Sequence, residues 1–210
     1  MSLKVLISAG PTRERIDAVR FLSNRSTGKM GFALAGAAAG AGYETVLVAG
    51  PVHLPTPEGV RRIDVESAAE MAEAVKNEAE TSDLVIMAAA VADYRPKYTI
   101  SGKMKKQDGE LVLELERTED ILKTLGAKKR PGQILVGFAA ETSDIETYAL
   151  GKLQKKNLDW IAANDVSRSD IGFGSDANAV TLYGRNGEKI QLSTASKPQI
   201  AEAVLKTVLS

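Results

Sequence analysis

The sequence predicts an α/β protein built on a doubly wound, mostly parallel sheet, with a small antiparallel strand pair near the C-terminus. Three observations favour this fold. Short apolar segments alternate with helical patterns over the first ninety residues, as in repeated β-α-β units. Most of these segments lack polar alternation, which is typical of strands covered on both faces. Later, Asn186-Gly187 separates two strand-like segments and favours a tight hairpin. The expected architecture is therefore Rossmann-like.

Four buried strands are expected in the first part of the chain. Each is short and apolar, and each ends at a turn or leads toward a helix. They cover residues 3–8, 45–49, 60–65 and 84–90. Because they alternate with helices, their connections should be right-handed and a ligand should bind beyond their carboxyl ends.

Two helices are expected between these strands. The first covers residues 28–41, consists mostly of small residues and is ended by Gly42. The second begins after Ser67, which forms a capping-box pattern with Glu70. Its apolar residues share one stripe at helical spacing, which predicts that this face packs on the sheet.

The second half of the chain is expected to continue the alternation. Its elements are a half-exposed strand at 111–115, a helix at 118–125, a strand at 133–138, a helix at 143–156 with Ser143 as its N-cap, and a strand at 159–163. The antiparallel hairpin covers about residues 178–193, and Ser196 begins a final helix. No internal repeat is visible, so residues 1–210 are expected to form one domain.

A long loop interrupts the alternation between residues 91 and 109, and its part at about 95–109 is expected to form a flap. It contains the charge cluster Lys103, Lys105 and Lys106. Such clusters are usually solvated loop surface. The alternative is a flap that covers a polyphosphate and neutralises the charge of leaving pyrophosphate.

Composition excludes several classes of function. Lys plus Arg and Asp plus Glu each number 27, so no global positive charge favours nucleic-acid binding. There is no cysteine and a single histidine, His53, which excludes disulfides, thiolate catalysis and multi-histidine zinc sites. The longest apolar run, residues 84–92, is about half of the ~20 residues that a membrane helix needs. No signal peptide is evident, so the expected location is the cytoplasm, without membrane association.

Two common phosphate fingerprints are missing. No G-x-G-x-x-G joins a strand to a helix, and Ser23 and Met30 break the Walker A pattern. Residues 24–31 are still polar and open a helix, whose N–H groups could face an anion, although such a short pattern is more often a plain N-cap. Asp93 is either a turn aspartate or a ligand of hydrated Mg²⁺ or of a nucleotide hydroxyl.

Seven segments, in order, resemble one known family. They are residues 10–14 (GPTRE), 20–31 (RFLSNRSTGKMG), 89–95 (AAVADYR), 103–106 (KMKK), 137–141 (GFAAE), 156–159 (KNLD) and 163–166 (ANDV). Each segment is weak alone, but together they are specific and extend over nearly the whole chain. The chain thus resembles bacterial phosphopantothenate–cysteine ligase, the phosphopantothenoylcysteine synthetase of coenzyme A biosynthesis.

The resemblance implies a reaction in two steps. The carboxylate of 4′-phosphopantothenate attacks the α-phosphate of CTP, pyrophosphate leaves, and an acyl-cytidylate remains. The amine of cysteine then attacks the acyl carbon, and CMP departs. No protein nucleophile is needed, because holding the partners together can supply roughly 7–11 kcal/mol of the barrier. Lysines, backbone N–H groups and Mg²⁺ would stabilise the developing charge.

The resemblance also implies roles for individual residues. Asn24 would steady the acyl-cytidylate, Lys103 would act on the triphosphate and the intermediate, and Arg20 would help to hold phosphopantothenate. The nucleotide would be bound by Met87, Ala88, Ala89, Asp93, Lys103, Glu119, Asp120, Phe138, Lys152 and Lys156. The family often has Asn-Pro-Asp where this chain has Thr118-Glu119-Asp120, so contacts at this position depart from the pattern. Asp93 is the one candidate metal ligand.

The resemblance further implies a homodimer and no flavin in this chain. Many relatives carry a flavin-dependent decarboxylase domain ahead of this one, so the chain is expected to be a stand-alone ligase or half of a bifunctional protein. Two other functions stay open: a nicotinamide-dependent oxidoreductase and a non-enzymatic nucleotide-binding module. The residues do not decide between CTP and ATP.

Overall fold

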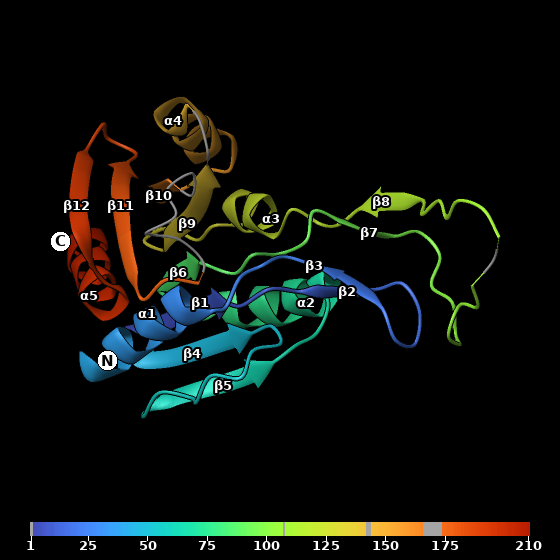
Figure 1. Cartoon of the computed structure of the whole chain (residues 1–210). Coiled ribbons are helices and arrows are strands. Elements are labelled where there is room, and N and C mark those ends of the chain that lie inside the picture. The colour runs from blue at the N-terminus through green and yellow to red at the C-terminus, as the bar shows by residue number, and fades with distance from the viewer. Residues whose placement is uncertain (1, 107, 142–143, 166–173) are drawn as a thin grey trace.

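The computed structural model describes residues 2–106, 108–141, 144–165 and 174–210. Within these residues, eight strands form one central sheet with helices on both faces (Figure 1). The order across the sheet is β12-β11-β10-β9-β6-β1-β4-β5. The parallel strands are β1 (Lys4–Ala9), β4 (Glu44–Ala49), β5 (Val60–Asp64), β6 (Leu84–Met87), β9 (Ile134–Glu141) and β10 (Trp160–Asp165). The predicted α/β fold with a mostly parallel sheet is confirmed.

The expected hairpin near the C-terminus forms one edge of this sheet. Its strands are β11 (Ala177–Gly184) and β12 (Lys189–Ser196), joined across Asn186-Gly187. β11 pairs antiparallel with β10, so the hairpin continues the hydrogen-bonded ladder of the parallel strands.

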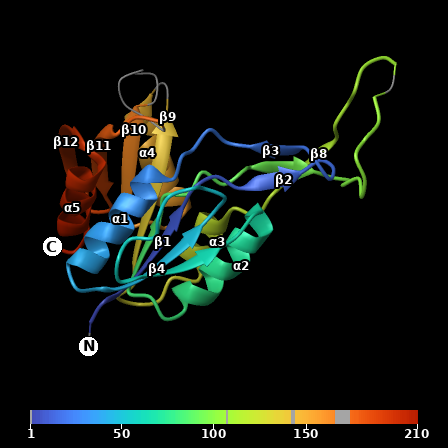
Figure 2. The same ribbon diagram turned by 60° about the horizontal axis from the view of Figure 1, so that its bottom comes forward.

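Different helices cover the two faces of the sheet (Figure 2). One face carries α1 (Lys29–Gly40) and α5 (Lys197–Val208), which pack against each other. The other face carries α2 (Ala68–Ala79), α3 (Ile121–Ala127) and α4 (Ile145–Lys155). Successive residues of β1 face opposite sides of the sheet. Ile7 lies in the hydrophobic core under α1 and α5, and Leu6 lies in the core under α2, α3 and α4. Burial on both faces explains why the strand segments are continuously apolar.

The start of α1 lies unusually close to β1. Gly28 has a φ of 77°, a left-handed conformation that lets the chain turn sharply into the helix. A Cβ atom at Gly31 would lie 2.4 Å from the Cβ of Ala9, so only glycine allows this contact. The glycines therefore set the first turn of α1 directly beside the carboxyl end of β1.

The sheet has a switch point beside β1. From β1 the chain moves outward to β4 and β5, and it then returns to the other side of β1 as β6. The connections that follow β1 and β6 thus leave in opposite directions, which opens a crevice at the carboxyl ends of these strands. An isolated parallel bridge joins Pro11 to Ala90 just beyond those ends.

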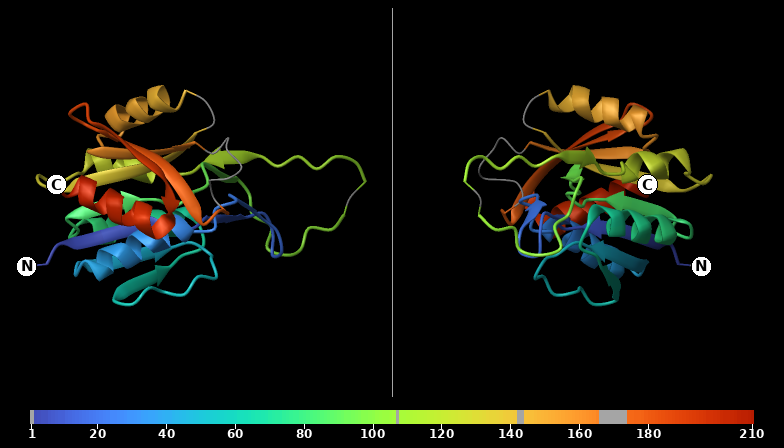
Figure 3. Two further views of the ribbon diagram at one scale, coloured as in Figure 1. Left: turned by 60° about the vertical axis from the view of Figure 1, so that its left-hand side comes forward. Right: turned by 90° about the vertical axis from the view of Figure 1, so that its right-hand side faces the viewer.

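Two small antiparallel ladders lie beyond this edge of the sheet. β2 (Arg13–Arg15) pairs with β3 (Phe21–Ser23), and β7 (Tyr94–Pro96) pairs with β8 (Leu115–Arg117). Between β7 and β8, the described residues of 97–114 form an extended arm that projects away from the central sheet (Figures 1 and 3). This arm corresponds to the expected flap.

Several sequence expectations were wrong in detail. The strand expected at 111–115 is not formed except at Leu115, because the apolar side chains before it, such as Val112, lie exposed on the arm instead of facing a core. The strand expected at 84–90 already ends at Met87. The helix expected from Thr118 begins at Ile121, since the Thr118 hydroxyl donates to the Ala92 carbonyl at 2.6 Å.

The capping box expected at Ser67 and Glu70 is formed only in part. The Ser67 hydroxyl accepts from the N–H of Glu70 as expected, but the Glu70 carboxylate accepts from the N–H of Glu66 instead of Ser67. Ser143 and Val166 lie outside the described residues. The capping box of Ser196 and Gln199 is present in full. In the part of the chain that the structure describes, no helix is long and apolar enough to span a membrane.

Candidate functional site

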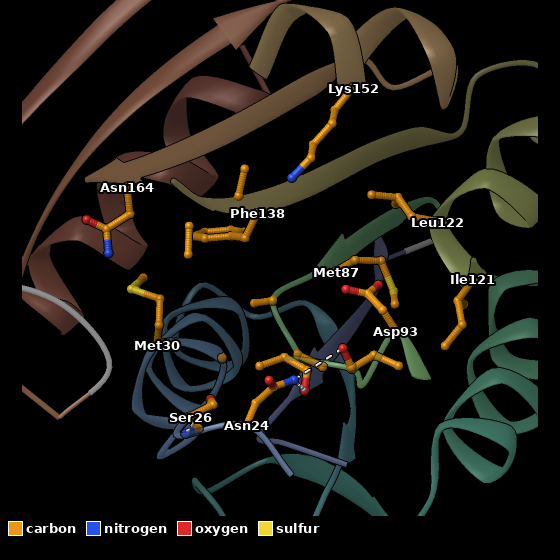
Figure 4. A pocket seen from close by; sticks show the side chains of 18 of the residues that line it. Asn24, Ser26, Met30, Met87, Asp93, Ile121, Leu122, Phe138, Lys152 and Asn164 are labelled. Atoms are coloured by element: carbon orange, nitrogen blue, oxygen red, sulfur yellow. Dashed lines mark hydrogen bonds between the residues drawn. The ribbon is translucent and has the colours of Figure 1, made fainter. Parts of the chain in front are cut away.

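A cavity of about 390 Å³ occupies the crevice at the carboxyl ends of the parallel strands, and we call it the switch-point pocket (Figure 4). Segments from both halves of the chain form its walls. Residues 24–31 at the start of α1 and residues 87–91 after β6 lie on one side, and α3, α4 and the end of β9 lie on the other. The crevice expected from the β-α-β order is therefore a lined pocket.

Most of the predicted site residues meet in this pocket. Its lining includes Asn24, Met87, Ala88, Ala89, Asp93, Glu119, Asp120, Phe138, Lys152 and Lys156. These residues come from five different segments of the chain. Figure 4 shows the amino end of Lys152 pointing toward the cavity from α4, close to the ring of Phe138.

The side chain of Asn24 has a fixed orientation at the pocket wall. Its Nδ2 donates to the carbonyls of Ala90 and Val91, at 2.9 and 3.3 Å. These carbonyls belong to the loop after β6, so Asn24 links the segment before α1 to that loop. An amide held in this way needs no reorganisation when a substrate arrives.

Buried hydroxyl groups hold the loop after β6 in place. The N–H of Ala89 donates to the Ser8 hydroxyl at 3.2 Å, and the N–H of Ala92 donates to the Thr12 hydroxyl at 3.0 Å. Ser8 and Thr12 are fully buried. The backbone of residues 87–92, which forms one wall, is thus fixed by β1 and the turn that follows it.

The two acidic side chains at the wall near α3 are each paired with a lysine. Lys156 Nζ lies 3.0 Å from Asp120 Oδ1, and the same oxygen caps α3 by accepting from the N–H of Lys123. Lys76 donates to Glu119 at 2.8 Å and holds the pKa of that carboxyl below its ordinary value. Because both carboxylates are paired with lysines, this wall does not repel an anion as strongly as its acidic residues suggest.

Apolar side chains form the rest of this wall. Met87, Leu122 and Phe138 all line the pocket beside the lysines. An apolar slot with cationic side chains near it suits a planar aromatic ring that carries phosphates.

Arg20 and Lys103 are not part of the described lining of the pocket. Arg20 lies in the turn between β2 and β3, where it donates to Asp17 and to the carbonyl of Met104. Lys103 lies on the arm, exposed to solvent. These two predicted residues therefore lie apart from the pocket of their own chain.

Sequence reasoning gave no role to several residues of the pocket, among them Asn164, Asn178 and Lys197. Among the described residues, Oδ1 of Asn164 is a buried oxygen without a hydrogen-bond partner. Lys197 is 5% exposed, and burial, together with nearby Lys29, lowers the pKa of its ammonium group. A lysine at the first position of a helix opposes the helix dipole, and this was the one signal in the sequence that could have indicated it.

The pocket suits a magnesium ion that arrives with a nucleotide. In the described residues, no cluster of three His, Cys, Asp or Glu side chains could hold a metal. Asp93 nonetheless places one carboxylate at the pocket. Mg²⁺ usually keeps several waters and binds through one or two carboxylates plus phosphate oxygens, so this donor set fits it.

Comparison with known proteins finds related sequences. Residues 1–210 match the family model described as the DNA/pantothenate metabolism flavoprotein C-terminal domain. The coenzyme A biosynthesis bifunctional protein CoaBC of Bacillus subtilis (strain 168) is 55% identical over 205 residues, which are 97% of this chain and 50% of that protein. CoaBC of Escherichia coli (strain K12) is 44% identical over 211 residues, covering 99% and 52%. The chain thus spans about half the length of these curated relatives.

Solved structures give the same fold. The C-terminal domain of a CoaBC protein has a TM-score of 0.84 at 47% identity, covering 98% of this chain and 93% of that chain. A Cab2 mutant in complex with phosphopantothenate-cysteine has a TM-score of 0.81 at 18% identity, covering 99% and 85%. At that lower identity, the likeness concerns the fold alone.

Proposed function

Since the chain belongs to the family of the DNA/pantothenate metabolism flavoprotein C-terminal domain, we propose that residues 1–210 act as one ligase domain of coenzyme A biosynthesis. It would join 4′-phosphopantothenate to cysteine in the cytoplasm, with CTP as co-substrate and no flavin. The observation that carries this proposal is the switch-point pocket, where ten residues assigned by resemblance meet from distant segments.

The nucleotide would lie across the pocket. Its base would pack on the apolar slot of Met87, Leu122 and Phe138, with Lys152 and Lys156 near its sugar and phosphates. The phosphates would extend toward the start of α1, where N–H groups and the helix dipole favour an anion. The dipole alone contributes about 0.3–1 kcal/mol, so the lysines must carry much of the binding.

The chemistry would proceed in two displacements. A carboxylate oxygen of 4′-phosphopantothenate forms a bond to the α-phosphorus while the bond to pyrophosphate breaks. The cysteine nitrogen then forms the amide bond while the acyl–oxygen bond to CMP breaks, and the amine loses its proton. Asn24, fixed against the carbonyls of Ala90 and Val91, would hold the acyl-cytidylate during the second displacement.

A magnesium ion would be held by Asp93 and by the phosphates of the nucleotide. When bound, it would neutralise phosphate charge and favour the departure of pyrophosphate. The other two carboxylates of the pocket, Glu119 and Asp120, are paired with Lys76 and Lys156, so Asp93 alone is left for the ion, which should depend on the nucleotide for its affinity.

We further propose a homodimer in which the arm of one copy brings Lys103 to the pocket of the other. The arm projects away from the central sheet (Figure 3), and none of its described residues lines the pocket of its own chain. It also carries exposed apolar side chains, which a partner would cover. These are Tyr98, Ile100, Leu111, Val112 and Leu113.

A pyrophosphate-release assay tests the proposed reaction. The chain is supplied with 4′-phosphopantothenate, cysteine, Mg²⁺ and either CTP or ATP, and both pyrophosphate and CMP are followed. We expect stoichiometric pyrophosphate and CMP with CTP. No pyrophosphate with any nucleoside triphosphate refutes the ligase. Binding of CTP without turnover would instead indicate a nucleotide-binding module, and tight binding of NADH would indicate an oxidoreductase.

A further inference from the structure

The turn between β2 and β3 contains a buried carboxylate to which the proposed reaction gives no role. The side chain of Asp17 is fully covered. Its Oδ1 accepts from the N–H of Val19 at 2.8 Å and from the N–H of Arg20 at 2.7 Å. These two bonds close the turn and account for one oxygen of the carboxylate.

The second oxygen of Asp17 connects the turn to the arm. Oδ2 accepts from Nε of Arg20 at 3.0 Å and from the backbone N–H of Met104 at 3.1 Å. Nη2 of Arg20 also contacts Oδ2 and donates to the carbonyl of Met104 at 3.0 Å. Both backbone polar groups of Met104, the neighbour of Lys103, are therefore held by the Asp17–Arg20 pair.

Backbone bonds extend this contact along the arm. The N–H of Ile100 donates to the carbonyl of Ile16 at 3.1 Å, and the N–H of Ala18 donates to the carbonyl of Gly102 at 3.4 Å. Residues 100–104 thus follow the turn at residues 16–20. The arm is attached to the body up to the residue beside Lys103.

Five donated hydrogen bonds also fix the charge of Asp17. They hold the pKa of its carboxyl far below the ordinary value, so the group is ionised at any pH near neutrality. Bonds to an ionised acceptor are stronger than neutral ones, which favours a stable attachment.

We propose that Asp17 is a positioning residue that holds Lys103 and Arg20 as one unit. The proposal rests on the proposed function, in which the arm brings Lys103 to a pocket, and on the role implied by the resemblance, in which Arg20 helps to hold phosphopantothenate. The Arg20 side chain is 45% exposed although it contacts Asp17 and Met104, so it can also receive an anion. An anion bound there would contact the same guanidinium that holds Met104, so the site that receives the anion and the backbone beside Lys103 share one side chain.

The variant Asp17→Asn tests the attachment without removing the turn. Asparagine keeps an Oδ1 acceptor for the N–H groups of Val19 and Arg20. Its NH₂ group, however, cannot accept from Arg20 or Met104. The matched control is Glu114→Gln, which breaks an exposed ion pair with Lys97 on the same arm.

Hydrogen exchange gives a readout that does not depend on activity. In Asp17→Asn, we expect amide exchange over residues 100–104 to become at least tenfold faster, while the strands of the central sheet keep their protection. Glu114→Gln should leave residues 100–104 unchanged. Unchanged exchange in Asp17→Asn overturns the proposal, whatever the enzyme does. If that variant does not fold, Arg20→Lys takes its place, since a lysine lacks the planar pair of donors, Nε and Nη2, with which Arg20 contacts Asp17 and Met104.

A double variant separates positioning from a general loss of structure. Asp17→Asn should lower kcat about tenfold. The double variant with Lys103→Gln should be no slower than Lys103→Gln alone, because both substitutions remove the same contribution, that of Lys103 to turnover. Losses that multiply would show that Asp17 acts independently of Lys103 and would overturn the proposal. A wild-type chain that releases no pyrophosphate would refute the ligase instead, and the exchange result would still decide whether Asp17 holds the arm.

Discussion

Single residues at the pocket are held by atoms of other segments. Asn24 lies before α1, yet its amide is oriented by two carbonyls of the loop after β6. A group held in this way can act on a late step without contributing to the binding of the first substrate.

The substitution Asn24→Ala is therefore expected to separate the two steps. Pyrophosphate should still be released, while transfer to cysteine should slow by roughly 10²–10³-fold, the usual effect of losing a positioned polar group. Rapid-quench assays of pyrophosphate and CMP measure the two steps. Asn77→Ala, at an exposed position on α2, serves as the control. An equal loss of both steps would contradict the assigned role.

Lys197 is a buried cation whose ammonium group donates to the Ser175 carbonyl and lies near Asp176, while its burial and nearby Lys29 oppose its charge. It is buried at the start of α5, where the helix dipole is unfavourable to a cation. Burial and Lys29 lower the pKa of its ammonium group below the lysine value of 10.5. The buried charge lowers the free energy of unfolding, but it also places a cation at the pocket wall.

We expect Lys197→Met to raise the melting temperature at pH 7. The folded chain binds this proton less tightly than the unfolded chain, so the charged lysine disfavours folding at neutral pH. That penalty fades as the pH rises toward the unfolded value. The advantage of the variant should thus shrink between pH 7 and about 10. Thermal unfolding over this range measures it, with exposed Lys206→Met as control. A lower melting temperature at pH 7 would contradict the expectation.

At the scale of elements, the pocket depends on how closely α1 approaches β1. Gly31 has no side chain, which permits this approach, because a Cβ atom there would lie only 2.4 Å from the Cβ of Ala9. Gly36 lies in the same helix, but a Cβ there would meet Pro57 at an ordinary 3.6 Å.

The pair of substitutions Gly31→Ala and Gly36→Ala should consequently act in opposite directions. Overpacking at Gly31 should lower the free energy of unfolding by about 1–3 kcal/mol. Gly36→Ala should raise it by roughly 0.5–1 kcal/mol, because alanine restricts the unfolded chain and favours helix. Urea denaturation measures both. Equal effects of the two changes would show that the close contact carries no cost.

The elements that could be predicted are those whose stabilising contacts join residues close together in the sequence. α5 was predicted together with its capping box, because Ser196 and Gln199 are neighbours in sequence. The ladder of β7 and β8 was not, since its partners lie about twenty residues apart and flank an exposed arm. In the pocket, short motifs indicated Asn24 and Asp93. Lys197 required the packing of α5 beside α1, which no local pattern encodes.

For the whole molecule, the decisive question is which pocket receives Lys103. The arm is attached to its own body beside Met104, and its described residues do not line the pocket of its own chain. Delivery to a second copy would make each site depend on two chains.

Mixing two inactive variants tests this arrangement. Lys103→Gln supplies a pocket with Asn24 intact, and Asn24→Ala supplies an arm with Lys103 intact. Random exchange of subunits should restore about a quarter of the wild-type transfer rate, since half of the dimers then hold one complete site. Ultracentrifugation confirms the dimer. No restoration after verified exchange would place Lys103 in the pocket of its own chain.

The packing of α5 beside α1 has a consequence for synthesis. Residues 24–31 of the cavity wall leave the ribosome before Lys197, which is the last of the lining residues in chain order. A nascent chain therefore has an incomplete cavity until α5 has been synthesised and has docked. A ligand that needs the whole lining should accordingly bind only after that step.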